Sequence, residues 1–239
     1  VVEPYPAVID CGPFKVSYVP ISHSIPESAG LVIDSAGGRI VHTGDFKIDM
    51  TPVVGDPFNT ALWEEIAKDG VKALVCDSTN IFSPHAGRSE MSIGPAITAL
   101  MRNATGMVAA TTFASNIARL KTLADAAVAA GRTVCLLGRS MNRMVEAAKE
   151  TGLLTDFPPT VGPEDAQNIP REQLMLLVTG SQGERRAASA QLSQGTYLGL
   201  TLKEGDTFLF SSKTIPGNEK GVIRIMNQLS ELGVDIIDD

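Results

Sequence analysis

From about residue 90 onward, apolar runs alternate with segments of helical spacing, and this alternation restricts the fold more than any other feature of the chain. The apolar runs cover residues 106–113, 133–138, 173–180 and 206–212. Segments of helical spacing cover residues 92–101, 115–131, 140–152, 184–194 and 218–232. Strands that are apolar on both faces are typical of a parallel sheet covered by helices. The pattern therefore predicts an α/β fold, with Ser115 as the N-cap of the helix at 115–131.

The first part of the chain is richer in strand patterns. Phe14–Pro20 alternates imperfectly, and two short apolar runs flank Ala36-Gly37-Gly38, which predicts a β-hairpin. Residues 60–68 show helical spacing with Thr60 as the predicted N-cap, and residues 71–80 form an apolar run with an acidic, polar end. We therefore predict two domains, with residues 1–88 as the first and residues 89–239 as the second.

Small polar clusters follow the apolar runs of the second domain. They occupy residues 111–116, 138–140, 179–184 and 211–213. The carboxyl ends of parallel strands line the ligand crevice of an open α/β sheet, and Gly or Ser at a helix start exposes N–H groups to an anion. Arg119 and Arg139 could add charge-assisted contacts. Any one cluster could be a simple helix cap, but four in parallel favour a shared phosphate-binding edge.

The overall composition narrows the classes of protein. The formal net charge of −7 argues against nucleic-acid binding by the whole surface, although not against a local basic groove. No apolar run approaches the roughly 18 residues of a membrane span, so we expect no membrane partner. Cys76 and Cys135 lie in apolar runs and are predicted to be buried free thiols, which suits a reducing cytoplasm.

Three strand ends of the first domain carry candidate metal ligands. His23, Asp45 and Asp77 each follow a predicted strand, and imidazole with carboxylate suits Zn²⁺ or Mn²⁺. On spacing alone, a histidine at a strand end is more often a hydrogen-bonded structural residue. Of the other two histidines, we expect His42 either to support a metal ligand from behind or to be structural, and His85 to be a loop residue.

Seven short motifs together resemble a known family. In order they are HSIPES, VHTGDFKID, CDSTN, TFASN, GRSM, TGSQGE and SSKTIPGNE, and they span nearly the whole chain. This series is similar to bacterial ribonuclease J, a metallo-β-lactamase-fold nuclease with an inserted β-CASP domain. The resemblance implies a partial metallo-β-lactamase αββα section in residues 1–88 and a β-CASP domain in residues 89–239.

The resemblance also implies roles for particular residues. His23 would be a zinc ligand, Asp45 would bridge two metal ions, and Asp77 would orient a metal-binding histidine, so both aspartates would be catalytic. RNA and its 5′-monophosphate would bind to a set in the second domain: Ser115, Asn116, Arg119, Gly180, Ser181, Gln182, Gly183 and Glu184. The implied activity is hydrolysis of RNA phosphodiesters by a 5′→3′ exoribonuclease and endoribonuclease.

The chain departs from the family pattern in its metal ligands. It contains neither the His-x-His-x-Asp-His motif nor the later histidines, and it has only three histidines. A two-metal hydrolase needs about seven or eight ligand positions. We therefore expect a fragment that is inactive alone and holds zinc weakly or not at all. A longer enzyme would carry two Zn²⁺ ions per active site, with Mn²⁺ or Mg²⁺ as alternatives, and would form a homo-oligomer.

Two other functional readings stay open from the sequence. The second domain could be a phosphate- or nucleotide-binding module without catalysis. The chain could also belong to another metallo-β-lactamase-superfamily hydrolase that acts on a small ester. The clusters TFASN and TGSQGE argue against the second alternative, because a small-ester hydrolase needs no phosphate-binding edge.

Overall fold

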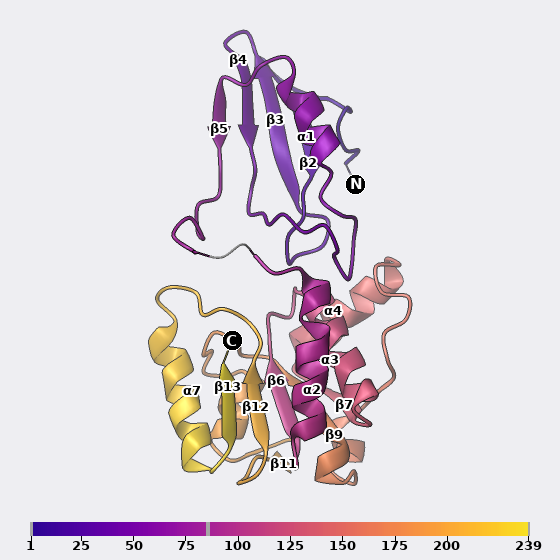
Figure 1. Ribbon diagram of the computed structural model, residues 1–239, viewed down its shortest axis with the longest axis vertical. Coiled ribbons are helices and arrows are strands. Elements are labelled where there is room, and N and C mark those ends of the chain that lie inside the picture. The colour runs from indigo at the N-terminus through magenta and orange to yellow at the C-terminus, as the bar shows by residue number, and fades with distance from the viewer. Residues whose placement is uncertain (1, 85–86, 239) are drawn as a thin grey trace. The chain divides into compact units, whose positions relative to one another are not determined.

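The computed structural model describes residues 2–84 and 87–238. It divides the chain into two compact units, Val1–Glu90 and Met91–Asp239, and each unit has its own sheet (Figure 1). The boundary lies two residues beyond the predicted division at 88/89.

Unit 1 is built on a five-stranded sheet in the order β1-β2-β3-β4-β5. Its elements are β1 (Ile9–Cys11), β2 (Phe14–Pro20), β3 (Ala29–Ser35), β4 (Gly38–His42), α1 (Thr60–Ala67) and β5 (Ala73–Val75). Strands β1 to β4 pair antiparallel, and β5 joins β4 in parallel. The predicted hairpin is confirmed, because β3 and β4 pair up to Ser35 and Gly38 around a two-residue turn.

Only one face of this sheet is covered within unit 1. Val19, Val32 and Val41 point to the side of α1 and form a small core with Ile66 of that helix. By strand alternation the other face carries half-buried or exposed apolar residues: Val16, Tyr18, Leu31, Ile33, Ile40 and Val75. No described element of unit 1 packs over this second face.

Two local predictions for unit 1 were wrong. Helix α1 is capped by Asn59, whose side-chain oxygen accepts a hydrogen bond from the Leu62 N–H, rather than by Thr60. Cys76 is exposed, because it follows the edge strand β5, which no described element of the unit covers. Cys135 is buried on a central strand of unit 2, as predicted.

Unit 2 contains a six-stranded sheet in the order β13-β12-β6-β9-β7-β8, and all its pairings are parallel. Its strands are β6 (Val108–Thr111), β7 (Thr133–Leu137), β8 (Thr160–Val161), β9 (Leu174–Val178), β12 (Thr207–Phe210) and β13 (Asp235–Asp238). A separate two-stranded hairpin consists of β10 (Thr196–Tyr197) and β11 (Leu200–Thr201). The predicted parallel sheet is therefore confirmed.

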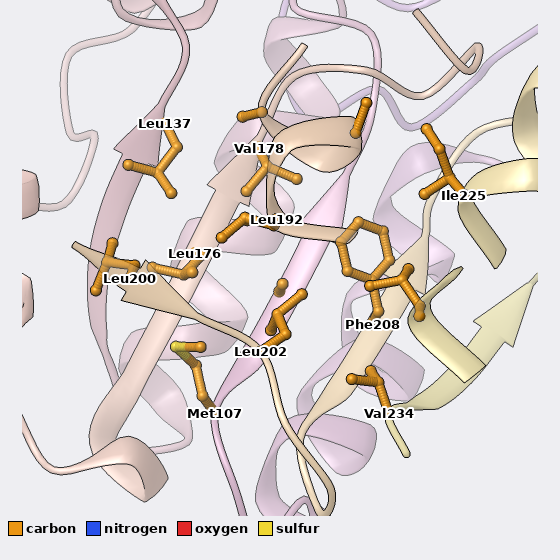
Figure 2. Packing of buried hydrophobic residues seen from close by; sticks show 14 of the residues in the cluster. Met107, Leu137, Leu176, Val178, Leu192, Leu200, Leu202, Phe208, Ile225 and Val234 are labelled. Carbon is orange, nitrogen blue, oxygen red and sulfur yellow. The ribbon is translucent and has the colours of Figure 1, made fainter. Parts of the chain in front are cut away.

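Helices pack on both faces of this sheet. They are α2 (Gly94–Asn103), α3 (Ile117–Ala129), α4 (Arg139–Glu150), α5 (Pro163–Ala166), α6 (Ala188–Ser193) and α7 (Glu219–Glu231), with short 3₁₀ turns at Glu90–Ser92 and Arg171–Gln173. Figure 2 shows the core on one face, where Leu176 and Val178 of β9 meet Leu192 of α6, and Phe208 of β12 meets Ile225 of α7. Helix α3 lies against β7 and β9 on the other face.

Four predictions for unit 2 differ from the structure. The N-cap of α3 is Asn116, not Ser115, because the Asn116 side chain accepts the Arg119 N–H. Helix α6 begins at Ala188 rather than at 184, since residues 180–187 form a loop. The proline-rich segment 157–170, predicted to be a loop, contains β8 and α5. The short strands β10, β11 and β13 were not predicted at all.

A buried arginine stabilises the amino-terminal edge of the sheet in unit 2. Arg132 is 4% exposed and donates hydrogen bonds to four backbone carbonyls, those of Met101, Ala104, Gly106 and Leu174, at 2.6–3.3 Å. These carbonyls belong to the end of α2, the connection to β6 and the start of β9. One side chain therefore joins three segments that are distant in sequence.

We expect Arg132→Met to lower the free energy of unfolding by about 3 kcal/mol, because the buried carbonyls would lose charge-assisted hydrogen bonds. Urea denaturation followed by far-UV circular dichroism measures this change. Arg102→Met is the matched control, since exposed Arg102 makes one hydrogen bond, to the Ala129 carbonyl. Equal losses in the two variants would contradict the structural role of Arg132.

In unit 1 a buried carboxylate stabilises the loop after β4. Asp49 is 2% exposed, and its carboxylate accepts the N–H groups of Thr51 (3.0 Å) and Glu90 (3.2 Å) and pairs with Lys47 at 2.9 Å. Burial alone would raise the pKa of Asp49. The hydrogen bonds from Ser89, Lys47 and the two N–H groups outweigh burial and lower the pKa to about 2.

Asp49→Asn is expected to destabilise unit 1 by about 2 kcal/mol near neutral pH. The folded-state pKa lies below the unfolded value, so the stabilisation is present above about pH 4 and is lost as the pH falls through about 2. Urea titrations followed by the fluorescence of Trp63, the single tryptophan, measure it. Exposed Asp56→Asn is the control, and a deficit that persists undiminished at pH 2 would contradict the assignment.

Candidate functional site

The three predicted metal-site residues of unit 1 lie on neighbouring segments at one edge of the sheet. His23 follows β2, Asp45 follows β4 and Asp77 follows β5. The Thr43 N–H donates to the Val75 carbonyl (2.9 Å), and the Asp77 N–H donates to the Thr43 hydroxyl (3.1 Å). The segments after β2 and β4 are joined by a hydrogen bond from the Lys47 N–H to the Ser22 carbonyl (2.8 Å).

The environment of Asp77 shows how close these segments come. The Thr79 hydroxyl (2.6 Å) and N–H (2.9 Å) donate to the Asp77 carboxylate and are the main reason that its pKa is lowered. The Phe46 N–H and the charge of His23 lower the pKa further. His23 and Asp77 are therefore within electrostatic reach of each other, on either side of the segment that carries Asp45.

Asp45 itself is exposed and makes no hydrogen bond or ion pair within the described part of the chain. Its neighbour His42 is also exposed, and the ring Nδ1 of His42 accepts the Gly44 N–H at 2.9 Å, which gives that histidine a role in shaping the turn. His85 lies outside the described residues. Across residues 2–84 and 87–238, no group of three or more His, Cys, Asp or Glu could hold a metal ion.

In unit 2, the predicted phosphate-binding residues gather at the carboxyl ends of β6, β9 and β12. Arg119, in the first turn of α3, donates to both the carbonyl and the hydroxyl of Ser211 at 2.8 Å, and Ser211 follows β12. The Asn116 side-chain oxygen accepts the Arg119 N–H at 3.0 Å, and the Ile117 N–H donates to the Ser115 carbonyl at 3.0 Å. Two N–H groups of this helix start are thus already paired.

Gln182 joins two loops at this edge instead of standing free. Its amide nitrogen donates to the Lys213 carbonyl (3.0 Å), and its amide oxygen accepts the Ile215 N–H (2.8 Å) and the Asn218 amide (3.2 Å). The Gln182 N–H in turn donates to the carboxylate of exposed Glu184 at 3.0 Å. The loop after β9 and the loop after β12 are therefore held together by one side chain.

Close packing requires glycine at positions 180 and 183, the two glycines among the predicted binding residues. Gly180 has φ of +109°, and an added Cβ would collide with the side chain of Ser189, whose hydroxyl donates to the Gly180 carbonyl at 2.9 Å. Gly183 has φ of +77°, and a Cβ there would collide with the backbone of Gly221 in α7. The packing of the fold therefore explains both glycines without a ligand.

At three neighbouring strand ends, a hydroxyl side chain makes no hydrogen bond to another described residue. Thr112 Oγ1, directly after β6, and Ser212 Oγ, after β12, are buried without a hydrogen-bond partner among the residues that the structure describes. Ser181 follows β9, is 3% exposed, and its hydroxyl has no partner within the part of the chain that the structure describes. The strands β12, β6 and β9 are neighbours in the sheet. Thr112 and Ser212 were not among the predicted site residues, although each stood in a polar cluster that the sequence showed.

A buried hydroxyl without a partner is rare in folded proteins and calls for an explanation, such as a bound group with acceptor atoms. Arg119 adds a positive charge at the same edge, and Arg185, Arg186 and Lys213 are exposed on the two loops beside it. The arrangement can therefore donate several hydrogen bonds to an anion in a positive environment.

The sheet order defines unit 2 as an open, parallel α/β domain, and polar side chains follow the carboxyl ends of its strands. Residues 105–229 match the family model described as ribonuclease J, beta-CASP domain. The chain therefore belongs to the ribonuclease J family.

Curated ribonuclease J sequences are similar to this chain over both units. The chain is 43% identical to the ribonuclease J of Sinorhizobium meliloti, over 97% of this chain and 41% of the relative. It is 40% identical to ribonuclease J 1 of Streptococcus pyogenes, over 93% of this chain and 40% of the relative. It is 36% identical to the ribonuclease J of Corynebacterium glutamicum, over 95% of this chain and 32% of the relative. The chain thus spans less than half the length of these relatives.

A solved structure supports the fold. A protein of unknown function from Enterococcus faecalis superposes with a TM-score of 0.65 over 99% of this chain and 54% of its own, at 14% identity. Among the described residues, no helix is both long enough and apolar enough to span a membrane.

Proposed function

We propose that this chain forms part of a ribonuclease that hydrolyses RNA, and that unit 2 binds the 5′-monophosphate of the substrate. Membership of the ribonuclease J family supports the activity. The single observation that carries the phosphate site is the set of three unpartnered hydroxyls, of Thr112, Ser181 and Ser212, on adjacent strand ends beside Arg119.

The chemistry of the hydroxyls favours a terminal phosphate. Each hydroxyl donates one hydrogen bond, and a phosphomonoester presents three oxygens that accept hydrogen bonds in different directions. A 5′-hydroxyl end has one oxygen and little charge, so it would leave most of the donors unpaired. A site that holds the 5′ end in this way favours processing from that end, in the 5′→3′ direction.

Thr112→Val with Ser212→Ala is expected to weaken binding of a 5′-monophosphorylated oligoribonucleotide to the chain about tenfold or more, because hydrogen bonds to a charged group are lost. Binding of the 5′-hydroxyl oligonucleotide should change little. The unfolding midpoint should not fall, since neither hydroxyl has a partner among the described residues of the free protein. Fluorescence anisotropy with labelled oligonucleotides measures affinity.

Thr98→Val on α2 is the control variant. Equal affinity of the wild-type chain for 5′-monophosphorylated and 5′-hydroxyl RNA would overturn the proposal.

Zinc is the metal that we propose for longer enzymes of the family, with His23 and Asp45 as the ligands that this chain contributes and Asp77 as a positioning residue. The described residues do not fit a complete centre, because they form no group of three or more ligands. Hydrolysis, homo-oligomerisation and the balance of exonucleolytic and endonucleolytic cleavage belong to the longer enzyme in this proposal.

We expect this chain, dialysed after exposure to zinc, to retain well below one equivalent of the metal and to leave RNA uncleaved, because two ligands hold zinc weakly. Mass spectrometry of the metal content and a cleavage assay on labelled RNA test this. The opposite result would be one or more equivalents of tightly held zinc that are lost in His23→Ala but kept in His42→Ala. It would show that the chain builds a metal centre by itself.

A further inference from the structure

A cavity of about 440 Å³ lies in unit 2 between the start of α4, the connection from β8 to α5 and the β10–β11 hairpin. It contains none of the three hydroxyls of the proposed phosphate site. One of the strand-end clusters, Gly138-Arg139-Ser140, borders it, and the proposed function leaves that cluster without a role.

One wall of the cavity is cationic. Arg139 and Arg143 stand one turn apart on α4, and both line the cavity with Glu146. Arg143 and Glu146 are 4.0 Å apart at an exposed position, whereas Arg139 makes no hydrogen bond or ion pair within the described residues. The start of α4 adds the positive end of its helix dipole, and its N-cap, Gly138, supplies no side-chain acceptor. Two guanidinium groups therefore face one carboxylate, with one guanidinium unpaired.

The opposite wall is formed by the hairpin corner, where Tyr197 and Leu198 line the cavity. Tyr197 packs partly into the core, and its hydroxyl has no partner within the described part of the chain. Leu198 has φ of +50° and Gly199 has φ of +78°, so the two-residue turn is left-handed at both positions. Such turns favour Asn or Gly at the position of Leu198. The corner is fixed by the Gln167 amide, which donates to the Leu198 carbonyl at 3.2 Å.

A strained leucine at a hairpin corner is the observation that suggests a ligand. The left-handed conformation disfavours a branched apolar side chain, and strain of this kind persists where the side chain serves a site. Here the side chain of Leu198 is half exposed and borders the cavity beside an aromatic ring. The cavity thus combines a flat apolar wall with a pair of guanidinium groups, which are able to hold a phosphate by several hydrogen bonds.

We propose that this cavity is a second binding site, independent of the 5′-phosphate site, for a nucleoside phosphate unit. The phosphate lies between Arg139 and Arg143, and the base lies against Tyr197 and Leu198. Asn142, whose side-chain nitrogen donates to the Gly138 carbonyl at 3.1 Å, keeps its amide oxygen for the ligand. The cavity volume suits one nucleotide rather than a folded partner.

The test is an NMR titration of the chain with uridine 5′-monophosphate, followed at the amide signals of Leu198 and Gly199. These signals separate this cavity from the hydroxyl site. Arg139→Gln with Arg143→Gln should weaken the response at these signals about tenfold or more. Lys149→Gln is the matched control, because it removes one charge from the same helix at a position over the Phe157 ring. Thr112→Val with Ser212→Ala should leave the response unchanged, so that failure of either site is seen separately.

Leu198→Asn is expected to change stability and binding in opposite directions. Asparagine tolerates the left-handed conformation, so the melting temperature should rise by about 2 °C or more while the apolar wall and the affinity are lost. A merely structural leucine would show no loss of binding. Circular dichroism melts and the same titration measure both effects.

Three ligands define the outcome. Uridine 5′-monophosphate should bind more tightly than inorganic phosphate and than uridine, and equal binding of phosphate and the nucleotide would overturn the role of the apolar wall. An oligouridine with a 5′-hydroxyl that shifts the same signals supports the site and assigns it to an RNA chain, whereas a response to the mononucleotide alone supports it and assigns it to free nucleotides. An unchanged response in the arginine double variant would overturn the proposal.

Discussion

The parallel alignment of β12, β6 and β9 is the constraint on which the chemistry of unit 2 depends. Phe210, Thr111 and Val178 occupy the same level in the three strands. The pairing continues one residue further, because the Ser211 N–H donates to the Thr111 carbonyl at 2.8 Å. Since all three strands run in the same direction, the residues that follow them leave the sheet at one edge. The segments that carry Thr112, Ser181 and Ser212 therefore lie at the same edge of the sheet, although these residues are far apart in sequence.

In the proposed phosphate site, neutral hydroxyl donors rather than a helix start would bind the anion. The Asn116 side chain and the Ser115 carbonyl already accept two N–H groups at the start of α3. Helix α6, which follows the loop after β9, has only six residues and so contributes little dipole. The hydroxyls of Thr112 and Ser212 have no competing partner in the described part of the chain, and their desolvation has already occurred on folding. An anion that binds there would gain hydrogen bonds from the two hydroxyls without a further desolvation cost for them.

The sequence predicted most of the sheet of unit 2 because each central strand is apolar on both faces and each lies between helices of clear spacing. Two-residue strands such as β8 and β10 contain too few residues to show a period, and their formation depends on neighbours that are distant in sequence. Helix α6 was placed four residues too early because residues 184–187 suit a helix locally. The packing of Gly180 against Ser189 and of Gly183 against α7 fixes a loop instead.

The candidate site shows the same limit at the level of single side chains. Sequence motifs placed polar residues at the ends of β6, β9 and β12, where the structure also has them. A motif does not reveal whether such a side chain makes a hydrogen bond within the fold. Gln182 and Arg119 were predicted to contact a ligand, and both make hydrogen bonds within the fold. Thr112 and Ser212 were overlooked, although their hydroxyls, like that of the predicted Ser181, have no partner among the described residues. Only the three-dimensional structure shows which polar side chains already have hydrogen-bond partners within the fold and which are available to a ligand.

The two proposed sites of unit 2 differ in physical mechanism, and this difference reconciles anion binding with an acidic chain of net charge −7. At the hydroxyl site most of the selectivity comes from directional hydrogen bonds in a buried setting, where the overall charge of the protein has little influence. At the cavity beside α4 two exposed guanidinium groups act over a short distance, within the roughly 8 Å over which physiological salt screens charges. In both cases recognition is local, so the acidic remainder of the surface can discourage non-specific contacts with RNA without weakening either site.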